Sequence, residues 1–295
     1  MNTKPITKQE YIILAVTAGT TKHGTPFVRL QVADFDTKFE ISVWGISKNE
    51  IPTVGQRVYF TKINFNKAPT MQKCFFSAEK VDAVFLDYDK NHELSEWLPK
   101  IVSDEDWNWL KKALLQYSTD SALKSIIDEQ MDRMLKLYAE FPAAATVHHA
   151  YKGGLLNHTY EALAMLCGIY KTLSFPVKIE HVILGLLFHD FGKICEYTDT
   201  GVMEDYSLLG HIYLGANELN KILLEEGVDP AEIKRIVHCV LAHHGKIEHG
   251  SPVLPCTAEA FLVFHLDALS GHGDIYANAT PGEYNKFVGT TVFRS

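Results

Sequence analysis

Residues 182–190 read VILGLLFHD, and this stretch decides how the second half of the chain folds. Seven apolar or small residues in succession, 182–188, are typical of a helix that is buried on every side. His189 and Asp190 follow at its end, where burying two polar groups without partners would be costly. A metal ion would satisfy both side chains, although two hydrogen-bonded core residues would give the same pattern.

The segments on either side of this stretch are also predicted to be helical. Apolar spacing of three and four, with glycine and proline between segments, predicts helices over 155–173, 179–188, 208–226, 231–243 and 257–269. A helical bundle can direct side chains from several helices to one centre. Further candidate ligands stand in an apolar context on these helices: His158, His211, His243, His244 and Asp267.

The ligand types and their positions favour a divalent metal. Imidazole and carboxylate without thiolate suit Mn, Fe, Co or Zn better than a soft metal. Neighbouring helical residues point ~100° apart, so both members of a pair such as His243–His244 reach one site only near a helix end. Gly192 and Gly245 provide such ends after the two pairs.

The first part of the chain predicts β-structure. Turn residues separate five segments that are rich in Val, Ile, Phe, Tyr and Thr: 10–18, 26–33, 37–44, 56–64 and 71–78. We expect tight loops at 21–26 and 34–36. Five short strands favour a small barrel, and the OB-fold is a five-stranded barrel that binds oligonucleotides. A barrel that serves only assembly is the alternative.

The 295 residues are therefore expected to form more than one unit. We predict an OB-fold domain at 1–88, a helical connector at 89–140 that packs on the next domain, and an all-helical domain at 141–295. The fold class is β followed by all-α.

Charge is unevenly distributed between these regions. Residues 1–90 hold 12 Lys and Arg against 9 Asp and Glu, whereas the remainder holds 16 against 27. The region after residue 90 is acidic and rich in His and Asp, and cations bound there would reverse the sign of its local charge. Aromatic rings among lysines in the barrel are candidates for base stacking, with core packing as the alternative for each ring: Phe27, Phe35, Phe39, Trp44, Tyr59 and Phe65, with Lys62, Lys67 and Lys73.

Cysteine usage and hydropathy exclude several classes of protein. The five cysteines are scattered and form no Cys-x-x-Cys pair, which argues against a disulfide framework or a cysteine zinc site. No run reaches the roughly 18 apolar residues of a membrane helix, and the N-terminus carries no apolar signal segment. We expect a cytoplasmic protein with no membrane partner.

The histidines and aspartates also carry a resemblance. The order His158, His189–Asp190, Asp267 resembles the HD-domain superfamily of metal-dependent phosphohydrolases, and His211 with His243–His244 resembles its two-metal variant. More closely, nearly the whole chain resembles the YhaM family of bacterial 3′→5′ exoribonucleases, although Ser270 stands where that family usually carries a second aspartate. The matching stretches are 26–44 with Gly55 in the β region, and 141–144, 148–159, 189–193, 210–212, 243–245, 248–252, 259–260 and 266–267 in the helical region.

The resemblance implies two divalent ions, with Mn²⁺ expected first and Fe, Co, Zn or Mg as alternatives. The first ion would be held by His158, His189, Asp190 and Asp267. Asp190 would bridge to a second ion, which His211 and His243 would also bind, with His244 as a further candidate ligand. Two such ions suit hydrolysis of a phosphodiester by a metal-activated hydroxide. Asp190 and Lys193 are the expected catalytic residues, and the expected substrate contacts are His149, Lys152, Lys193 and Ser251.

The sequence thus predicts a 3′→5′ exoribonuclease acting on single-stranded RNA, with single-stranded DNA as a further candidate, in a homo-oligomer. The polarity and the RNA preference come from the resemblance alone. Two alternatives stay open at this point. One is an HD phosphodiesterase acting on a cyclic or short nucleotide, and the other is a non-catalytic single-strand-binding protein.

Overall fold

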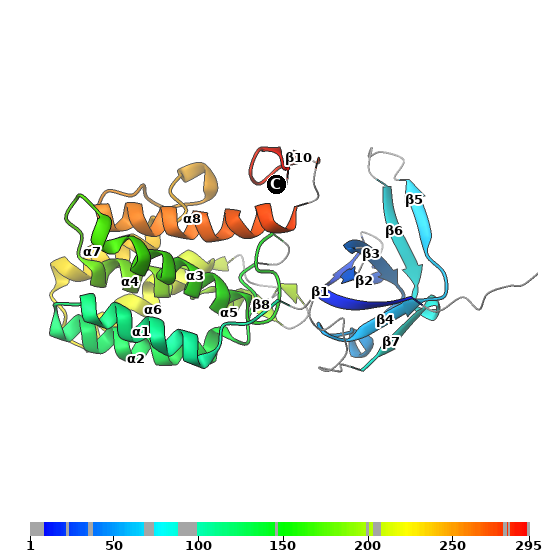
Figure 1. Ribbon diagram of the computed structural model, residues 1–295, viewed down its shortest axis with the longest axis horizontal. Coiled ribbons are helices and arrows are strands. Elements are labelled where there is room, and N and C mark those ends of the chain that lie inside the picture. Colours follow the sequence, from blue (N-terminus) through cyan, green and yellow to red (C-terminus); the bar gives the residue numbers. More distant parts are fainter. Residues whose placement is uncertain are drawn as a thin grey trace, which may run out of the picture. The chain divides into compact units, whose positions relative to one another are not determined.

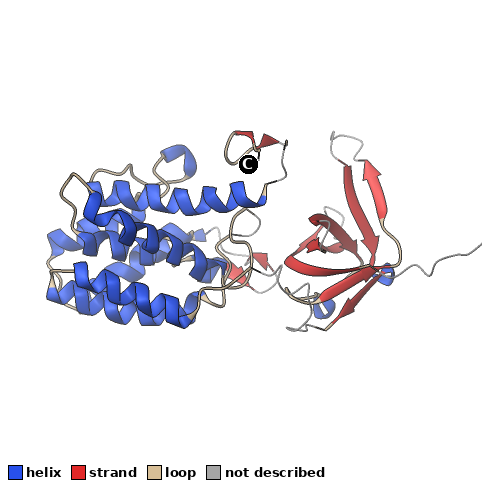
Figure 2. Ribbon diagram, viewed as in Figure 1, coloured by secondary structure: helices blue, strands red, loops and turns tan. Residues whose placement is uncertain are grey.

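The computed structural model describes residues 9–21, 24–34, 38–67, 74–87, 99–144, 147–198, 201–202, 208–279, 282 and 284–293. The chain divides into two compact units, Met1–Lys100 and Ile101–Ser295. The first is built from strands and the second from helices (Figure 2). This order of a β unit followed by a helical unit confirms the predicted fold class.

The first unit is one curled, mixed sheet (Figure 1). Its strand order is β5-β6-β3-β2-β1-β4-β7, and β3 pairs with β6 in parallel while the other pairs are antiparallel. Apolar side chains such as Ile13, Leu30, Ile41 and Val58 are fully buried and form its core. The strands are β1 (Glu10–Thr20), β2 (Pro26–Ala33), β3 (Lys38–Trp44), β4 (Arg57–Phe60), β5 (Asn64–Lys67), β6 (Cys74–Glu79) and β7 (Ala83–Leu86).

The described sheet has seven strands where the sequence predicted five. The fourth predicted segment ends early as β4, and β5 follows after a break. The fifth appears as β6, and a 3-10 turn, η2 (Lys80–Asp82), leads from it into the unpredicted β7. Because β6 pairs with β3 and β7 pairs with β4, this broken strand links opposite sides of the strand order, as a curled sheet allows. That connectivity agrees with a small barrel, and the OB-fold assignment itself stays a prediction.

The two predicted loops are described only in part. At 21–26, Gly24 has a φ of 80° and its N–H donates to the carbonyl of Thr21, as a tight loop requires. The other loop, at 34–36, lies largely outside the described residues, as do Phe35 and Lys73. The side chains of Phe65 and Lys67 also lie outside them.

The helical unit is arranged around α4, whose ten residues are all buried. Helices α2, α3, α6, α7 and α8 all contact it, which explains why the sequence of α4 is apolar without a polar face. The helices are α1 (Asp104–Tyr117), α2 (Ser121–Tyr138), α3 (Gly154–Ile169), α4 (Ile179–Phe188), α5 (Lys193–Glu196), α6 (His211–Glu225), α7 (Pro230–Leu241) and α8 (Ala258–Asn278). Short two-stranded pairs, β8 (Tyr197–Thr198) with β9 (Gly201–Val202) and β10 (Tyr284–Asn285) with β11 (Thr290–Thr291), follow α5 and α8.

Helices α1 and α2, expected as part of a connector, are integral to the helical unit. Trp107 of α1 is fully buried and its indole N–H donates to the carbonyl of Met131 in α2. Tyr138 of α2 is also fully buried, and its hydroxyl donates to the carbonyl of Leu187 in α4. The two helices therefore share the core of the unit that begins at Ile101.

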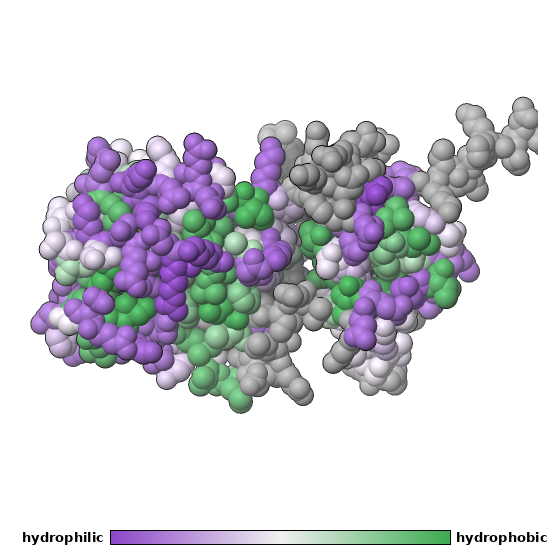
Figure 3. Space-filling model, turned by 90° about the horizontal axis from the view of Figure 1, so that it is seen from below, coloured by the Kyte–Doolittle hydropathy of each residue, from purple (hydrophilic) through white to green (hydrophobic). Residues whose placement is uncertain are grey.

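The surface of the helical unit is mainly polar on the face drawn in Figure 3, with apolar patches between the polar side chains. Within the described residues, no helix has both the length and the apolar composition to cross a membrane.

Candidate metal centre

Five histidines and two aspartates from α3, α8 and the ends of three other helices form one cluster. His158 lies in α3 and Asp267 in α8, whereas His189 caps the C-terminus of α4 and Asp190 follows it. The remaining members are His211 at the first position of α6 and His243–His244 just after α7. The paired residues thus stand at helix ends, as the ~100° rotation between neighbours requires.

Glycine allows the start of α6 to approach the end of α4. A Cβ at Gly192 would clash with the main chain of His211. The close approach places His211 beside Asp190, with 3.8 Å between its Nε2 and the Asp190 Oδ1. Gly192 therefore has two roles: it ends the helix, and its lack of a side chain lets His211 approach Asp190.

Backbone carbonyls at helix ends fix three of the imidazole rings. The Nδ1 atoms of His189, His243 and His244 lie 2.7, 2.7 and 2.8 Å from the carbonyl oxygens of residues 186, 240 and 249. The last carbonyls of a helix lack partners within it, so they can accept these bonds. Because a carbonyl only accepts, each Nδ1 carries a proton, which leaves Nε2 as the atom available to a metal.

The first group of ligand atoms surrounds His158. Its Nε2 lies 3.1 Å from Asp267 Oδ1, 3.1 Å from His189 Nε2 and 3.6 Å from Asp190 Oδ2. Two imidazoles that bind one ion at about 2.1 Å and at a right angle bring their nitrogens about 3 Å apart. A cation between them would therefore explain why two ring nitrogens face each other at this distance.

The second group of ligand atoms surrounds Oδ1, the other carboxylate oxygen of Asp190. Asp190 Oδ1 is 3.8 Å from His211 Nε2 and 3.9 Å from His243 Nε2, and His211 Nε2 is 3.3 Å from His244 Nε2. His243 Nε2 is buried and has no hydrogen-bond partner among the described residues. Glu196 fixes His211, because its Oε1 accepts from the His211 backbone N–H and lies 3.3 Å from Nδ1.

The protonation states agree with metal ligation. Burial opposes the charge of Asp190, but Lys193 and His189 hold its pKa well below the usual range. The pKa of Asp267 is likewise lowered against burial, mainly by the hydrogen bond from His158. Burial also lowers the pKa of His158 and of His243. Ionised carboxylates and neutral imidazoles are the forms that bind a metal, so this cluster can hold a divalent ion.

His189 differs from the other ligands. Burial disfavours its charged form, but Asp190 and Asp267 raise its pKa overall. In the absence of a cation, a proton is thus favoured between the facing nitrogens and carboxylates. A metal ion would replace that proton, since both neutralise the same pair of aspartates.

The four residues expected to contact substrate occupy different surroundings. Lys193 is buried and its Nζ lies 2.6 Å from Asp190 Oδ2. His149 is buried with its Nε2 3.3 Å from Glu161 Oε2. Lys152 is exposed and pairs with Glu140 at 2.6 Å. Ser251 is buried, and its hydroxyl lies within 3.1 Å of the carbonyls of Leu241 and Val253. Of these contacts, only the one from Lys193 reaches a candidate metal ligand. The substrate roles of Lys193, His149, Lys152 and Ser251 stay predictions.

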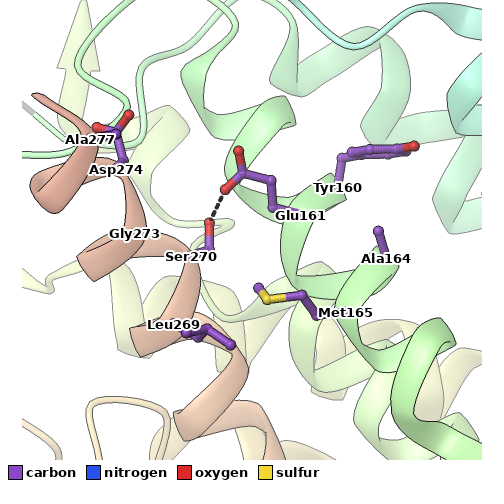
Figure 4. A pocket seen from close by; sticks show the side chains of 9 residues that line it. All are labelled: Tyr160, Glu161, Ala164, Met165, Leu269, Ser270, Gly273, Asp274 and Ala277. Atoms are coloured by element: carbon purple, nitrogen blue, oxygen red, sulfur yellow. Dashed lines mark hydrogen bonds between the residues drawn. The ribbon is translucent and has the colours of Figure 1, made fainter. Parts of the chain in front are cut away.

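Sequence reasoning missed the residues that hold His158 in place. Its Nδ1 lies 2.9 Å from Ser270 Oγ, and the Ser270 hydroxyl donates to Glu161 Oε2 at 2.6 Å (Figure 4). Helical spacing carried a signal, because Glu161 follows His158 by three residues and Ser270 follows Asp267 by three. Glu196 gave no such signal, since the chain between it and His211 is not helical throughout.

Comparison with known proteins agrees with this geometry. The HD domain family matches residues 155–271, a range that includes every member of the cluster. The 3′-5′ exoribonuclease YhaM of Listeria welshimeri is 26% identical over 283 residues, covering 92% of this chain and 88% of the relative. The YhaM exoribonuclease of Bacillus pumilus is 26% identical, and the match covers 93% of this chain and 89% of that protein. The one of Halalkalibacterium halodurans is also 26% identical, and the match covers 94% of this chain and 88% of that protein.

No solved structure matches the chain significantly. The similarity to the relatives extends through the β unit as well as the helical unit, because it covers more than nine-tenths of the chain. The chain therefore contains an HD domain at residues 155–271 and resembles the YhaM exoribonucleases along nearly its whole length.

Proposed function

We propose that this chain is a divalent-metal-dependent 3′→5′ exoribonuclease that hydrolyses single-stranded RNA, with single-stranded DNA as a further substrate. The observation that carries the proposal is the placement of Asp190. One of its oxygens faces His158 and His189, and the other faces His211 and His243. A carboxylate placed in this way between two groups of imidazoles suits a two-ion phosphodiesterase.

Two ions are proposed, with Mn²⁺ expected first and Fe, Co, Zn or Mg as alternatives. His158, His189, Asp190 and Asp267 would hold the first, and Asp190, His211 and His243 the second, with His244 available. When bound, the ions supply Lewis acidity and a water acidified to near neutral pH. The protein residues supply the orientation, because backbone carbonyls and carboxylates fix the ligand rings.

Lys193 is proposed to bind the scissile phosphate. Its ammonium already lies at Asp190, so a phosphate that approaches the ions would meet a donor placed for a charge-assisted hydrogen bond. Lys193 is buried, which strengthens its interaction with an anion relative to a lysine in water. His149, Lys152 and Ser251 are proposed along the RNA path.

The β unit, proposed as residues 1–88, would hold the RNA strand. Its surplus of positive charge suits the phosphate backbone. Rings on its sheet contact one another in a row: Tyr11 with Phe39 at 5.1 Å and Phe39 with Phe76 at 5.3 Å between centroids. Phe76 is 38% exposed, so a base can stack on it. Residues 89–140 are proposed as a connector whose helices pack on the catalytic domain, 141–295, and the chain is proposed to form a homo-oligomer.

One assay tests the proposal against its alternatives. Purified protein with Mn²⁺ is offered a 5′-labelled oligoribonucleotide, the matching oligodeoxyribonucleotide and a cyclic dinucleotide. We expect a ladder of RNA products shortened from the 3′ end, which a chelator abolishes and added Mn²⁺ restores. Cleavage of the cyclic dinucleotide alone would favour the phosphodiesterase, and binding of RNA without cleavage would favour the single-strand-binding protein.

A further inference from the structure

His158 is held differently from the other buried ligand rings. His189 and His243 follow helices, so the Nδ1–H of each donates to the carbonyl three residues earlier, at the helix end. His158 lies in α3, where backbone carbonyls accept bonds from the next helical turn. Its Nδ1 therefore needs an acceptor from elsewhere, and Ser270 of α8 provides it at 2.9 Å.

Among His158, Ser270 and Glu161, the direction of each hydrogen bond follows from which group has a proton to donate. A serine hydroxyl has one proton, and Ser270 directs it to Glu161 Oε2 at 2.6 Å. Burial opposes the charge of Glu161, but hydrogen bonds from His149 and Ser270 lower its pKa, so it acts as an acceptor. The Ser270 oxygen is then left to accept from His158 Nδ1–H, so Ser270 and Glu161 favour the tautomer whose Nε2 is available to a cation, whereas Asp267 favours a proton on Nε2 when no cation is bound.

We propose that Ser270 and Glu161 are positioning residues that hold His158 in its metal-binding tautomer and thereby set the affinity of the first ion. The inference rests on the proposed metal centre and goes beyond it. Residues that orient a ligand in this way typically contribute about 10- to 100-fold to metal affinity. Because Ser270 is 3% exposed, water does not substitute readily for its hydroxyl.

The pair also borders a pocket of about 480 Å³ between α3 and α8 (Figure 4). Apolar side chains such as Tyr160, Met165 and Leu269 form its walls, and Glu161 and Ser270 lie side by side within it. The Glu161 side chain is 47% exposed, so its charge remains partly solvated. Removing that charge should therefore affect the tautomer of His158 more than the stability of the fold.

Binding of Mn²⁺ to the full chain tests the proposal without RNA. Ser270→Ala should weaken one of the two ions by about 10- to 100-fold and leave the other near its wild-type affinity. Ser270→Thr keeps the hydroxyl and should retain both. Ser118→Ala is the matched control, because it removes a buried serine hydroxyl that bonds to the carbonyl of Leu114 in α1. Calorimetry gives affinity and stoichiometry, and thermal unfolding shows whether each variant remains folded.

The tautomer itself is read from ¹⁵N shifts of the histidine rings in metal-free protein. Wild type should show a larger share of His158 with its proton on Nδ1 than Ser270→Ala and Glu161→Gln show. Folded Ser270→Ala with wild-type affinity for both ions, or with an unchanged tautomer, would overturn the proposal. If wild type binds no Mn²⁺, the proposed metal centre fails instead, and the ¹⁵N shifts still decide whether the pair orients His158.

Discussion

Asp190 is the residue on which the whole site depends. Its two oxygens face different imidazole groups, and Lys193 offsets part of its charge when no cation is near. The sequence singled out Asp190 because a polar pair ends an apolar helix. It could not show which oxygen faces which ligand, because that depends on where α3, α6 and α7 place their histidines.

Asp190→Asn should lose both ions and reduce RNA hydrolysis by at least about 100-fold. The change removes the one negative charge shared by both groups and leaves the cations uncompensated. Elemental analysis of the purified protein and a gel assay give the two values. Asp128→Asn is the control, since Asp128 is an exposed acid paired with Lys111 in another part of the helical unit. Full activity with both ions present in Asp190→Asn would show that the carboxylate has another role.

His148 should make the metal-free protein less stable in acid. Burial, together with His158, lowers the pKa of His148 from 6.5 to about 3. Between these values the unfolded chain binds a proton that the folded chain does not, so the free energy of unfolding falls as pH drops below about 6.5. His148→Phe should reduce this slope, by up to about 1.4 kcal/mol per pH unit.

Urea unfolding of chelator-treated protein at pH 4.5, 5.5 and 7 measures that slope. His265→Gln replaces an exposed histidine of α8 and provides the control. The lowered pKa values of His158 and His243 act in the same direction, so some slope should remain in His148→Phe. An unchanged slope in that variant would contradict the assignment of His148 as a neutral buried group.

Among the elements, the helices could be predicted better than the strands. The predicted helix at 179–188 matches α4 to the residue, and 231–243 is within two residues of α7 at each end. Apolar periodicity and glycine determine these ends locally. The prediction at 257–269 ended nine residues too early, because Gly271 and Gly273 look like terminators although packing continues α8 to Asn278.

The strands show where local patterns fail. A curled sheet breaks its strands where pairing partners change, and those partners lie far away in the sequence. The interruption between β6 and β7 therefore carried no clear local signal. Distance along the sequence also hid the hydrogen bond between Ser270 and Glu161, which are 109 residues apart, although each follows a candidate ligand by about one helical turn.

Gly192→Ala tests the packing of α4 against α6. The added Cβ would meet the backbone of His211, so the start of α6 must shift and move His211 away from Asp190. We expect loss of the second ion with retention of most of the first, measured by elemental analysis and Mn²⁺ titration. Gly168→Ala is the control, because a Cβ at this position in α3 would meet no atom within 4 Å. Equal loss of both ions would indicate one coupled site or general unfolding.

At the scale of the whole molecule, chemistry and strand binding are assigned to different units. The candidate ligands all lie in the unit that starts at Ile101, whereas the surplus of positive charge lies before residue 91. Charge counts and the strand pattern were sufficient to predict this division. The boundary itself required the structure, because α1 and α2 are amphipathic and their partners in the core are distant in sequence.

A chain limited to residues 101–295 should bind long RNA more weakly than the full chain, yet cleave a dinucleotide at a similar rate. A dinucleotide offers too few phosphates for backbone binding to contribute much, and backbone binding by the β unit should account for the steep salt dependence on long RNA. Circular dichroism must first show that the shortened chain is folded. If it then keeps full affinity for long RNA, the β unit serves assembly.

The most direct test of the central claim is anomalous X-ray diffraction at the Mn edge on crystals of the full chain grown with Mn²⁺. We expect two peaks about 3.5–4 Å apart with Asp190 between them. One peak should lie among His158, His189 and Asp267, and the other among His211 and His243. A single peak, or peaks away from these residues, would contradict a two-ion centre bridged by Asp190.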